Sequence, residues 1–128
     1  MNKVVRPINE IELDIRTHRR DSSPYILADY ENELAEYYIY YGEVEKAVAV
    51  YLKMIRHHWR YEDIATKAQL RLAELYCDIH LGIAFIVARG LFTSIKKSDK
   101  ERLHSIFKRC APLWYRPIAD FRLWLINL

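Results

Sequence analysis

Apolar residues recur every three or four positions along most of the chain, which is the spacing of an amphipathic helix. The clearest stretch begins at Pro24, which fits the first turn of a helix because an N–H there would have no partner, and Ser22 or Ser23 precedes it as a cap. Its apolar stripe is Leu27, Tyr30, Leu34, Tyr38 and Tyr41. Because Gly42 follows, the pattern predicts a helix over residues 24–41.

Further apolar stripes predict helices over residues 44–58, 63–78, 81–95 and 98–110, followed by an apolar last segment over residues 118–128. The turn at Gly42 is so short that the first two helices should form an antiparallel hairpin, in which the small Ala47 allows close approach. The stretch 81–95 is apolar on most sides, which predicts a central position in the core. In the helix over residues 98–110, the inward positions are Leu103, Ile106 and Phe107.

The first 20 residues fit two structures. Alternation of apolar and acidic residues from Ile11 to Ile15 fits a short strand, whereas a spacing of three and four residues fits one face of a helix. The apolar face of that helix would consist of Ile8, Ile11 and Ile15. Asn9 is a possible capping residue. We interpret residues 1–20 as an N-terminal arm and favour the helix.

The composition fits one folded helical domain. The chain has 128 residues, of which 52% are hydrophobic and 29% charged, so it can bury a core and is not disordered as a whole. Three Gly and four Pro are too few for the many tight turns of a sheet protein. We therefore predict a single all-α domain, with the N-terminal arm over residues 1–20, two helical hairpins over residues 24–95 and a C-terminal cap over residues 98–128.

Two features favour the cytoplasm. The first residues lack the apolar run of a secretory signal, and the most apolar run, residues 79–95, is too short for a confident transmembrane span. Cys77 and Cys110 fit free thiols in a reducing compartment, although one disulfide is compatible with the sequence. We expect a cytoplasmic protein.

A repeated motif stands on the two predicted hairpins. The first copy, over residues 28–58, has Leu34, Ala35, Tyr38, Gly42, Ala47 and Tyr51 at spacings that suit helix packing and a tight turn. The second copy, over residues 63–95, is degenerate: Leu72, Ala73 and Tyr76 repeat the start of the first, and Ala84 and Ala88 follow one residue out of register. This pattern resembles the tetratricopeptide repeat (TPR).

The resemblance implies antiparallel helical hairpins stacked as a short TPR-like solenoid, with a C-terminal capping helix. It also implies an adaptor or chaperone-like subunit that holds a segment of a partner protein in a concave groove. The groove residues that it selects are Asp29, Asn32, Glu36, Ile39, Tyr40, Lys67, Leu70, Glu74, Cys77 and Asp78. This set leans acidic, so it favours a basic or amphipathic segment, unless the carboxylates only form a solvated helix face. Glu36 and Glu74 stand where carboxylate-binding relatives have asparagine, which disfavours a C-terminal carboxylate as the ligand.

The C-terminal segment is a second candidate for binding. Ile118, Phe121, Leu125 and Leu128 share one helix face, and the aromatic residues of the candidate interface are Trp114, Tyr115, Phe121 and Trp124. The segment either caps the core of the repeats or docks a partner or a second copy of the chain, since surplus exposed apolar area marks an interface. If the segment docks a partner, the protein would be an inhibitor or an assembly factor.

Three basic clusters make nucleic-acid binding an alternative hypothesis. They lie within residues 16–20, 56–60 and 96–109, and the last is on a predicted helix with its Lys and Arg on the outer side. The net charge of +3 is too small to imply nucleic acid by itself, and cations are common at the C-terminal ends of helices. The alternative is therefore a small regulatory protein that binds nucleic acid through the helix over residues 96–109.

No residue pattern points to chemistry. Cys77 and His80 lie three apart on a helix but supply only two of the four ligands that a structural zinc site needs. No serine stands in a nucleophile-elbow context, and no Gly-rich loop is present to cradle a phosphate. We expect no enzyme, no cofactor and no bound metal.

Overall fold

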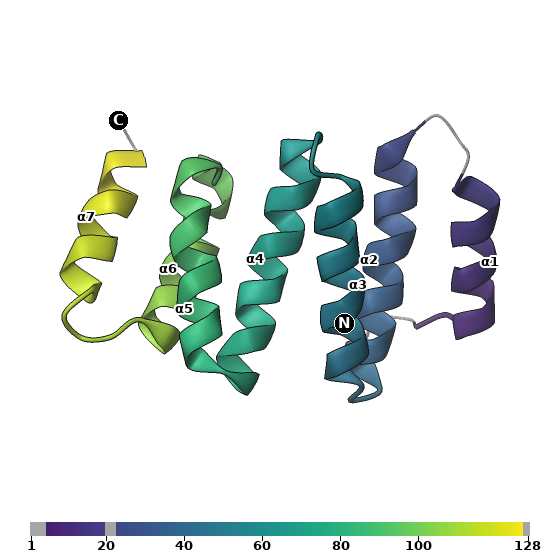
Figure 1. Cartoon of the computed structure of the whole chain (residues 1–128), viewed down its shortest axis with the longest axis horizontal. Helices are drawn as coiled ribbons and strands as arrows, with labels where there is room; N and C mark the ends of the chain where they lie inside the picture. Colours follow the sequence, from purple (N-terminus) through teal and green to yellow (C-terminus); the bar gives the residue numbers. More distant parts are fainter. Residues whose placement is uncertain (1–4, 20–22, 127–128) are drawn as a thin grey trace. The chain divides into compact units, whose positions relative to one another are not determined.

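A computed structural model describes residues 5–19 and 23–126, and in these residues the chain is all helical with no strand (Figure 1). The all-α prediction is therefore confirmed. The helices are α1 (Ile8–His18), α2 (Pro24–Tyr40), α3 (Val44–His57), α4 (Glu62–Ile79), α5 (Leu81–Gly90), α6 (Lys100–Cys110) and α7 (Arg116–Ile126), with 3₁₀ helices η1 (Leu91–Thr93) and η2 (Lys97–Asp99) between α5 and α6. The chain divides into two compact units, Met1–Ala68 and Gln69–Leu128, which are described one at a time.

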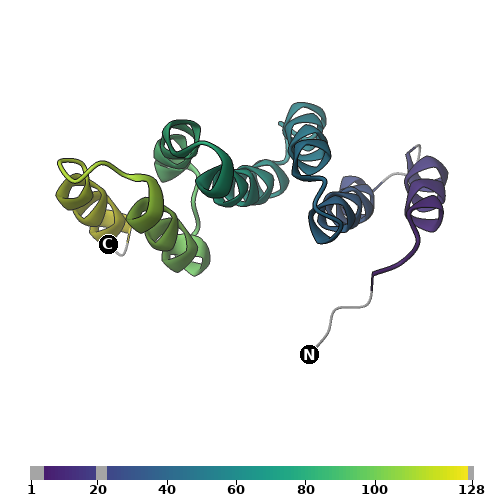
Figure 2. The same cartoon turned by 90° about the horizontal axis from the view of Figure 1, so that it is seen from below.

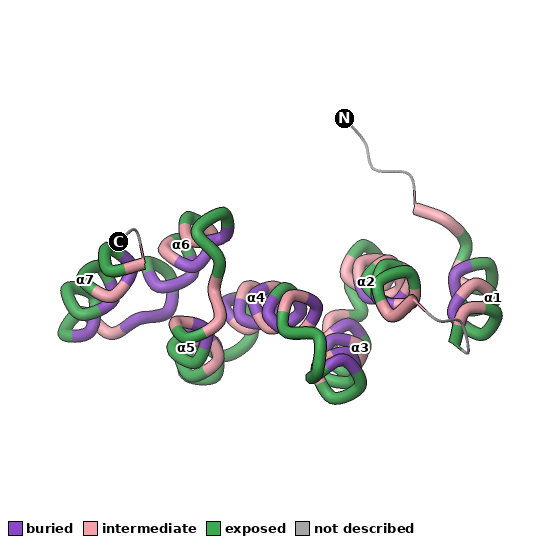
Figure 3. Tube along the Cα trace, turned by 90° about the horizontal axis from the view of Figure 1, so that it is seen from above, coloured by how far each residue is buried: buried purple, intermediate pink, exposed green. Residues whose placement is uncertain are grey.

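In the first unit, α2 lies beside both α1 and α3, as Figure 2 and Figure 3 show from two sides. The helical reading of the N-terminal arm is confirmed by α1. The prediction that Asn9 caps it is wrong, because the helix already begins at Ile8, after Pro7. Arg6 attaches this end of α1 to α2, since its Nη2 lies 2.5 Å from Oε1 of Glu33. This hydrogen-bonded carboxylate raises the pKa of Arg6 above its ordinary value.

The α2–α3 hairpin has the predicted start and turn. Pro24 is the first residue of α2, and the cap position before it is Ser23, whose side chain makes no capping hydrogen bond; Ser22 lies outside the described residues. Gly42 adopts a φ of +78°, a left-handed conformation that favours glycine, and the Glu43 N–H then donates to the Tyr38 carbonyl at 2.8 Å. The hairpin is therefore closed by a glycine turn.

Small side chains make the contact between α2 and α3. Ala35 and Ala47 are fully buried, so the two backbones approach closely. This contact rotates α2 away from the predicted stripe: Leu27 and Leu34 are only half-buried, and Tyr41 is exposed. The prediction that Tyr41 packs in the core is therefore wrong. The buried row of α2 is formed by Ala28 and Ala35, which directly follow Leu27 and Leu34 in the sequence.

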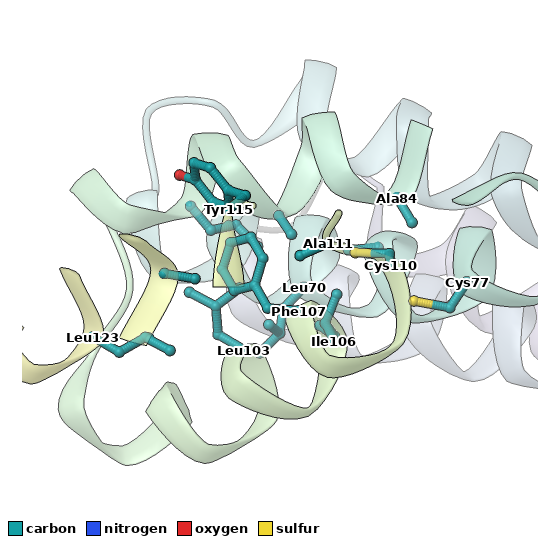
Figure 4. Close-up of a cluster of buried hydrophobic side chains, with 14 residues drawn as sticks. Leu70, Cys77, Ala84, Leu103, Ile106, Phe107, Cys110, Ala111, Tyr115 and Leu123 are labelled. Carbon is teal, nitrogen blue, oxygen red and sulfur yellow. The ribbon is translucent and has the colours of Figure 1, made fainter. Parts of the chain in front are cut away.

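The second unit has one apolar core, formed by the last turns of α4 with α5, α6 and α7 (Figure 4). Leu103, Ile106 and Phe107 of α6 are buried in it, as predicted. The expectation that α5 is central is wrong. Only Ala84 and Ala88 of this helix are buried, because the small residues again face the neighbouring helices while larger ones such as Leu81, Ile83 and Ile86 point outward.

Each unit is built from helices that expose one side to solvent, as the mixture of buried and exposed positions around every helix in Figure 3 shows. Among the described residues, no helix combines the length and the apolar character that crossing a bilayer requires. The charged faces explain this, since even α4, which has 18 residues, carries charged side chains along its length.

Candidate interaction surfaces

Two of the five predicted groove residues of α2 form hydrogen bonds within the first unit. Tyr51 of α3 is fully buried, and its Oη lies 3.0 Å from Oδ1 of Asn32 and 2.9 Å from Oε1 of Glu36. The polar ends of Asn32 and Glu36 thus hold the Tyr51 hydroxyl. Asp29 and Tyr40 are exposed.

Three of these α2 residues line a cavity of about 190 Å³ between α1 and α2. The lining from α2 includes Glu36, Ile39 and Tyr40, and Arg6 and Ile11 contribute from the other side. Arg6 pairs with Glu33 on the wall of this cavity, and Glu36 adds a second carboxylate to it. The structure therefore brings together part of the predicted α2 set, around a small cavity.

The predicted groove residues of α4 are partly buried in the core and partly at the surface. Leu70 was expected to face a partner, but it is fully buried in the core of the second unit, which corrects that prediction. Cys77 is likewise buried, because both residues lie on the side of α4 that α6 covers (Figure 4). Glu74 and Asp78 lie at the surface, and Lys67, which belongs to the first unit, is exposed.

The acidic side chains of α4 pair with the basic side chains of α6. Nη2 of Arg102 lies 2.5 Å from Oε1 of Glu74, and Arg109 pairs with Asp78 one turn further along α4 and two turns further along α6. These two pairs neutralise two of the four acids that were expected to attract a basic partner. The same pairs engage Arg102 and Arg109, two of the cations on which the nucleic-acid hypothesis depended. Within residues 96–109, Lys96, Lys97 and Lys108 are exposed.

The α7 helix has one buried side and one exposed apolar side. Ala119 and Leu123 are buried in the core, whereas six large apolar side chains between residues 113 and 125 are between 44% and 77% exposed. We call these six residues the α7 surface: Leu113, Trp114, Ile118, Phe121, Trp124 and Leu125. Phe121 and Trp124 stack with their ring centroids 6.0 Å apart.

Tyr115 does not belong to that surface. It was expected to be part of the C-terminal interface, but it is 5% exposed and packs edge-on against Phe85 at 4.8 Å, which corrects the prediction. Its hydroxyl has no hydrogen-bond partner among the described residues. Leu128, expected on the same face as Phe121, lies outside those residues.

A cavity of about 330 Å³ adjoins the α7 surface between α6 and α7. Trp124 and Leu123 supply its apolar wall, and Nε2 of His104 lies 3.3 Å from Oδ1 of Asp120 on its polar side. The α7 surface thus combines an apolar centre, a hollow and a polar margin, which is the usual anatomy of a protein interface.

One buried polar pair was not foreseen from the sequence. His58, expected only as part of a basic cluster, is buried, and its Nε2–H donates to Oε1 of Glu31 at 2.6 Å. Both residues line a groove of the first unit together with Arg19, Lys53 and His57. The sequence offered only one signal for this groove, namely the basic residues within residues 16–20 and 56–60 at the ends of two expected helices. Nothing in the sequence indicated that those two helix ends lie together.

The cysteines do not form a reactive or metal-binding site. Both thiols are free and buried, and burial raises the pKa of Cys77 and raises that of Cys110 to about 12. No group of three or more His, Cys, Asp or Glu side chains in the described part of the chain is arranged to hold a metal ion.

No protein-family model matches the chain, and neither a curated protein nor a solved structure matches it. The resemblance to the tetratricopeptide repeat accordingly depends on the residues of the chain itself.

Proposed function

We propose that the chain is a non-enzymatic module that binds another protein through the α7 surface. The observation that supports this most strongly is the exposure of six large apolar side chains, two of them tryptophan, on one short segment. Clustered exposed apolar side chains mark interaction sites in folded proteins, and Trp is enriched among the residues that contribute most to binding energy.

The α7 surface lies on a helix whose opposite side is packed into the core, which favours binding. Ala119 and Leu123 fix the opposite side of the helix in the core, and Arg122 lies over the Phe92 ring with its guanidinium carbon 4.2 Å from the ring centroid. A preorganised surface loses little conformational entropy when a partner docks. The partner that fits is an apolar face of another protein, with a side chain for the hollow beside Trp124.

We also propose that α2 and α3 form a TPR-like repeat, and that α4 and α5 form a degenerate second one in a short solenoid. Support comes from the glycine turn at Gly42 and from the complete burial of Ala35 and Ala47, which are among the positions that carry the resemblance. On this proposal the protein is a cytoplasmic adaptor or chaperone-like subunit. A crystal structure of the full chain tests the stacking of the two hairpins.

The proposed binding surface is tested by affinity capture from the cell that makes the protein, with quantitative mass spectrometry. The test variant is Phe121→Ser/Trp124→Ser, and the control is Tyr37→Ser/Tyr41→Ser, which removes two aromatic rings from the end of α2. We expect the test variant to lose partners that the wild-type and control proteins both retain. Retention of every partner by the test variant would contradict the proposal.

Self-association is a separate outcome of the same experiment. If the only partner lost is a second copy of the chain, sedimentation of the purified wild-type protein will show a concentration-dependent mass that the test variant lacks. In that case the α7 surface is a dimer interface, and the proposal of a different partner protein is wrong.

A further inference from the structure

A second surface, in the first unit, consists of a groove that runs over α2 between α1 and α3. Its volume is about 580 Å³, within the range of roughly 300–1,000 Å³ that is typical of ligand pockets. The residues that line it are Ile15, Arg19, Ser23, Pro24, Leu27, Glu31, Leu34, Val50, Lys53, His57, His58 and Tyr61. All of them belong to the first unit, so the groove is complete within it.

The walls of the groove are apolar. Leu27 and Leu34 of α2 are half-buried, and Ile15 of α1 and Val50 of α3 stand on either side of them. Because Leu27 and Leu34 are seven positions apart on one helix, the groove follows α2 for about 10 Å. That length suits a short segment of chain, such as two turns of an amphipathic helix, better than a compact small molecule.

The acidic residue on the floor of the groove has a hydrogen-bond partner within the first unit. Glu31 is the acidic residue that lines it, and its Oε1 accepts a hydrogen bond from Nε2 of buried His58 at 2.6 Å. The carboxylate is therefore already satisfied by a residue of the same unit.

The rim of the groove is basic. Arg19 at the end of α1 and Lys53 and His57 of α3 are exposed, and none of the three makes an ion pair with another described residue. Two of the three basic clusters seen in the sequence, over residues 16–20 and 56–60, thus contribute to one groove; Arg20 of the first cluster lies outside the described residues.

We propose that this groove binds an acidic amphipathic segment of another protein. Its apolar side chains pack against Leu27, Leu34 and Val50, and its carboxylates pair with Arg19, Lys53 and His57. Charge complementarity at the rim sets the sign of the ligand, and the apolar walls select a peptide over a nucleic acid, whose backbone has no apolar face to bury. This site lies on different helices from the α7 surface and goes beyond the function proposed for it.

The experiment is selection of displayed random short peptides on the immobilised full chain, followed by fluorescence anisotropy with the selected peptides. We expect enrichment of peptides that combine Leu, Ile or Phe with Asp and Glu. Their Kd should rise about tenfold or more for Arg19→Glu/Lys53→Glu, since each reversal replaces an attraction by a repulsion at the rim. Lys46→Glu is the matched control, because it reverses a charge at the first turn of α3, away from the groove, and should leave Kd unchanged.

Three results would overturn the proposal. The first is enrichment of basic peptides, or of none. The second is enrichment of acidic peptides whose Kd is the same for the wild-type protein and for Arg19→Glu/Lys53→Glu. The third is displacement of the selected peptides by a single-stranded oligonucleotide with equal dependence on Arg19 and Lys53, which would assign the groove to nucleic acid. Circular dichroism of each variant distinguishes loss of binding from loss of folding, and Leu34→Ser with a retained fold should also weaken binding if the walls contribute.

Discussion

His58 and Glu31 form a buried hydrogen bond that joins the end of α3 to the middle of α2, with Nε2 of His58 2.6 Å from Oε1 of Glu31. Because both side chains are removed from water, neither can lose its partner without leaving an unsatisfied polar group in the protein interior.

We predict that His58→Ala lowers the free energy of unfolding by about 3 kcal/mol, because it leaves the buried Glu31 carboxylate unpaired. His57→Ala is the matched control, since His57 is exposed and its loss should change stability by less than about 0.5 kcal/mol. Urea unfolding followed by circular dichroism measures both. Equal midpoints for the two variants would show that the pair does not stabilise the first unit.

A second prediction contrasts two buried tyrosines. The Oη of Tyr51 hydrogen bonds to Asn32 and Glu36, whereas the Oη of Tyr115 has no partner among the described residues. Tyr51→Phe should therefore cost about 1–2 kcal/mol, and Tyr115→Phe should be neutral or stabilising. Thermal unfolding compares them directly. A loss for Tyr115→Phe as large as that for Tyr51→Phe would mean that its hydroxyl is satisfied in solution.

A third prediction separates the two sides of α7. Leu123 is 3% exposed and Leu125, two residues further on, is 44% exposed. Leu123→Ala should destabilise the second unit by about 2–4 kcal/mol through the cavity that it leaves, whereas Leu125→Ala should cost less than about 1 kcal/mol. Chemical denaturation of the two variants tests this. If Leu125→Ala is the more costly change, the face that we assign to a partner is instead part of the core.

A fourth prediction concerns the thiols. Burial raises the pKa of Cys77 and raises that of Cys110 to about 12, so the reactive thiolate is scarce at neutral pH in the folded protein. Alkylation by iodoacetamide should be slow in buffer and fast in urea. Similar rates in the two conditions would show that the core of the second unit opens readily.

The same shift fixes the direction of a pH effect. Above the ordinary thiol pKa the unfolded chain releases the proton of Cys110, while the folded protein retains it up to about 12. The stabilisation is therefore complete below the ordinary pKa and is lost as the pH rises toward 12. Cys110→Ala should make the fall in unfolding free energy over this alkaline range less steep, although other groups also titrate there.

The helices themselves could be predicted from the sequence because each depends on local spacing. Pro24, Gly42 and the stripe of α6 are local signals, and they gave the helical hairpin, its turn and the inward residues of α6 correctly. Which side of each helix is buried was harder to predict. In α2 and α5, rows of alanine and rows of larger apolar residues follow the same period, so spacing alone cannot say which row faces the neighbouring helix.

The candidate surfaces were predictable only in part, because they depend on contacts between helices. Trp114, Phe121 and Trp124 were singled out from their apolar character and are exposed. The pairing of Arg102 with Glu74, and the meeting of Arg19 with Lys53 around one groove, join residues about 30 positions apart. No local pattern contains that information, so the expected acidic groove is largely paired internally, and the basic groove was missed.

The central claim is that the α7 surface contacts another protein in the cell. The most direct measurement is site-specific photo-crosslinking, with a photoreactive phenylalanine analogue at Phe121 in one variant and at Tyr41 in another, because these aromatic positions are 59% and 58% exposed. We predict a discrete covalent adduct with another protein from position 121 and only weak, heterogeneous adducts from position 41. Adducts that are equally weak at both positions, or stronger at position 41, would contradict the claim.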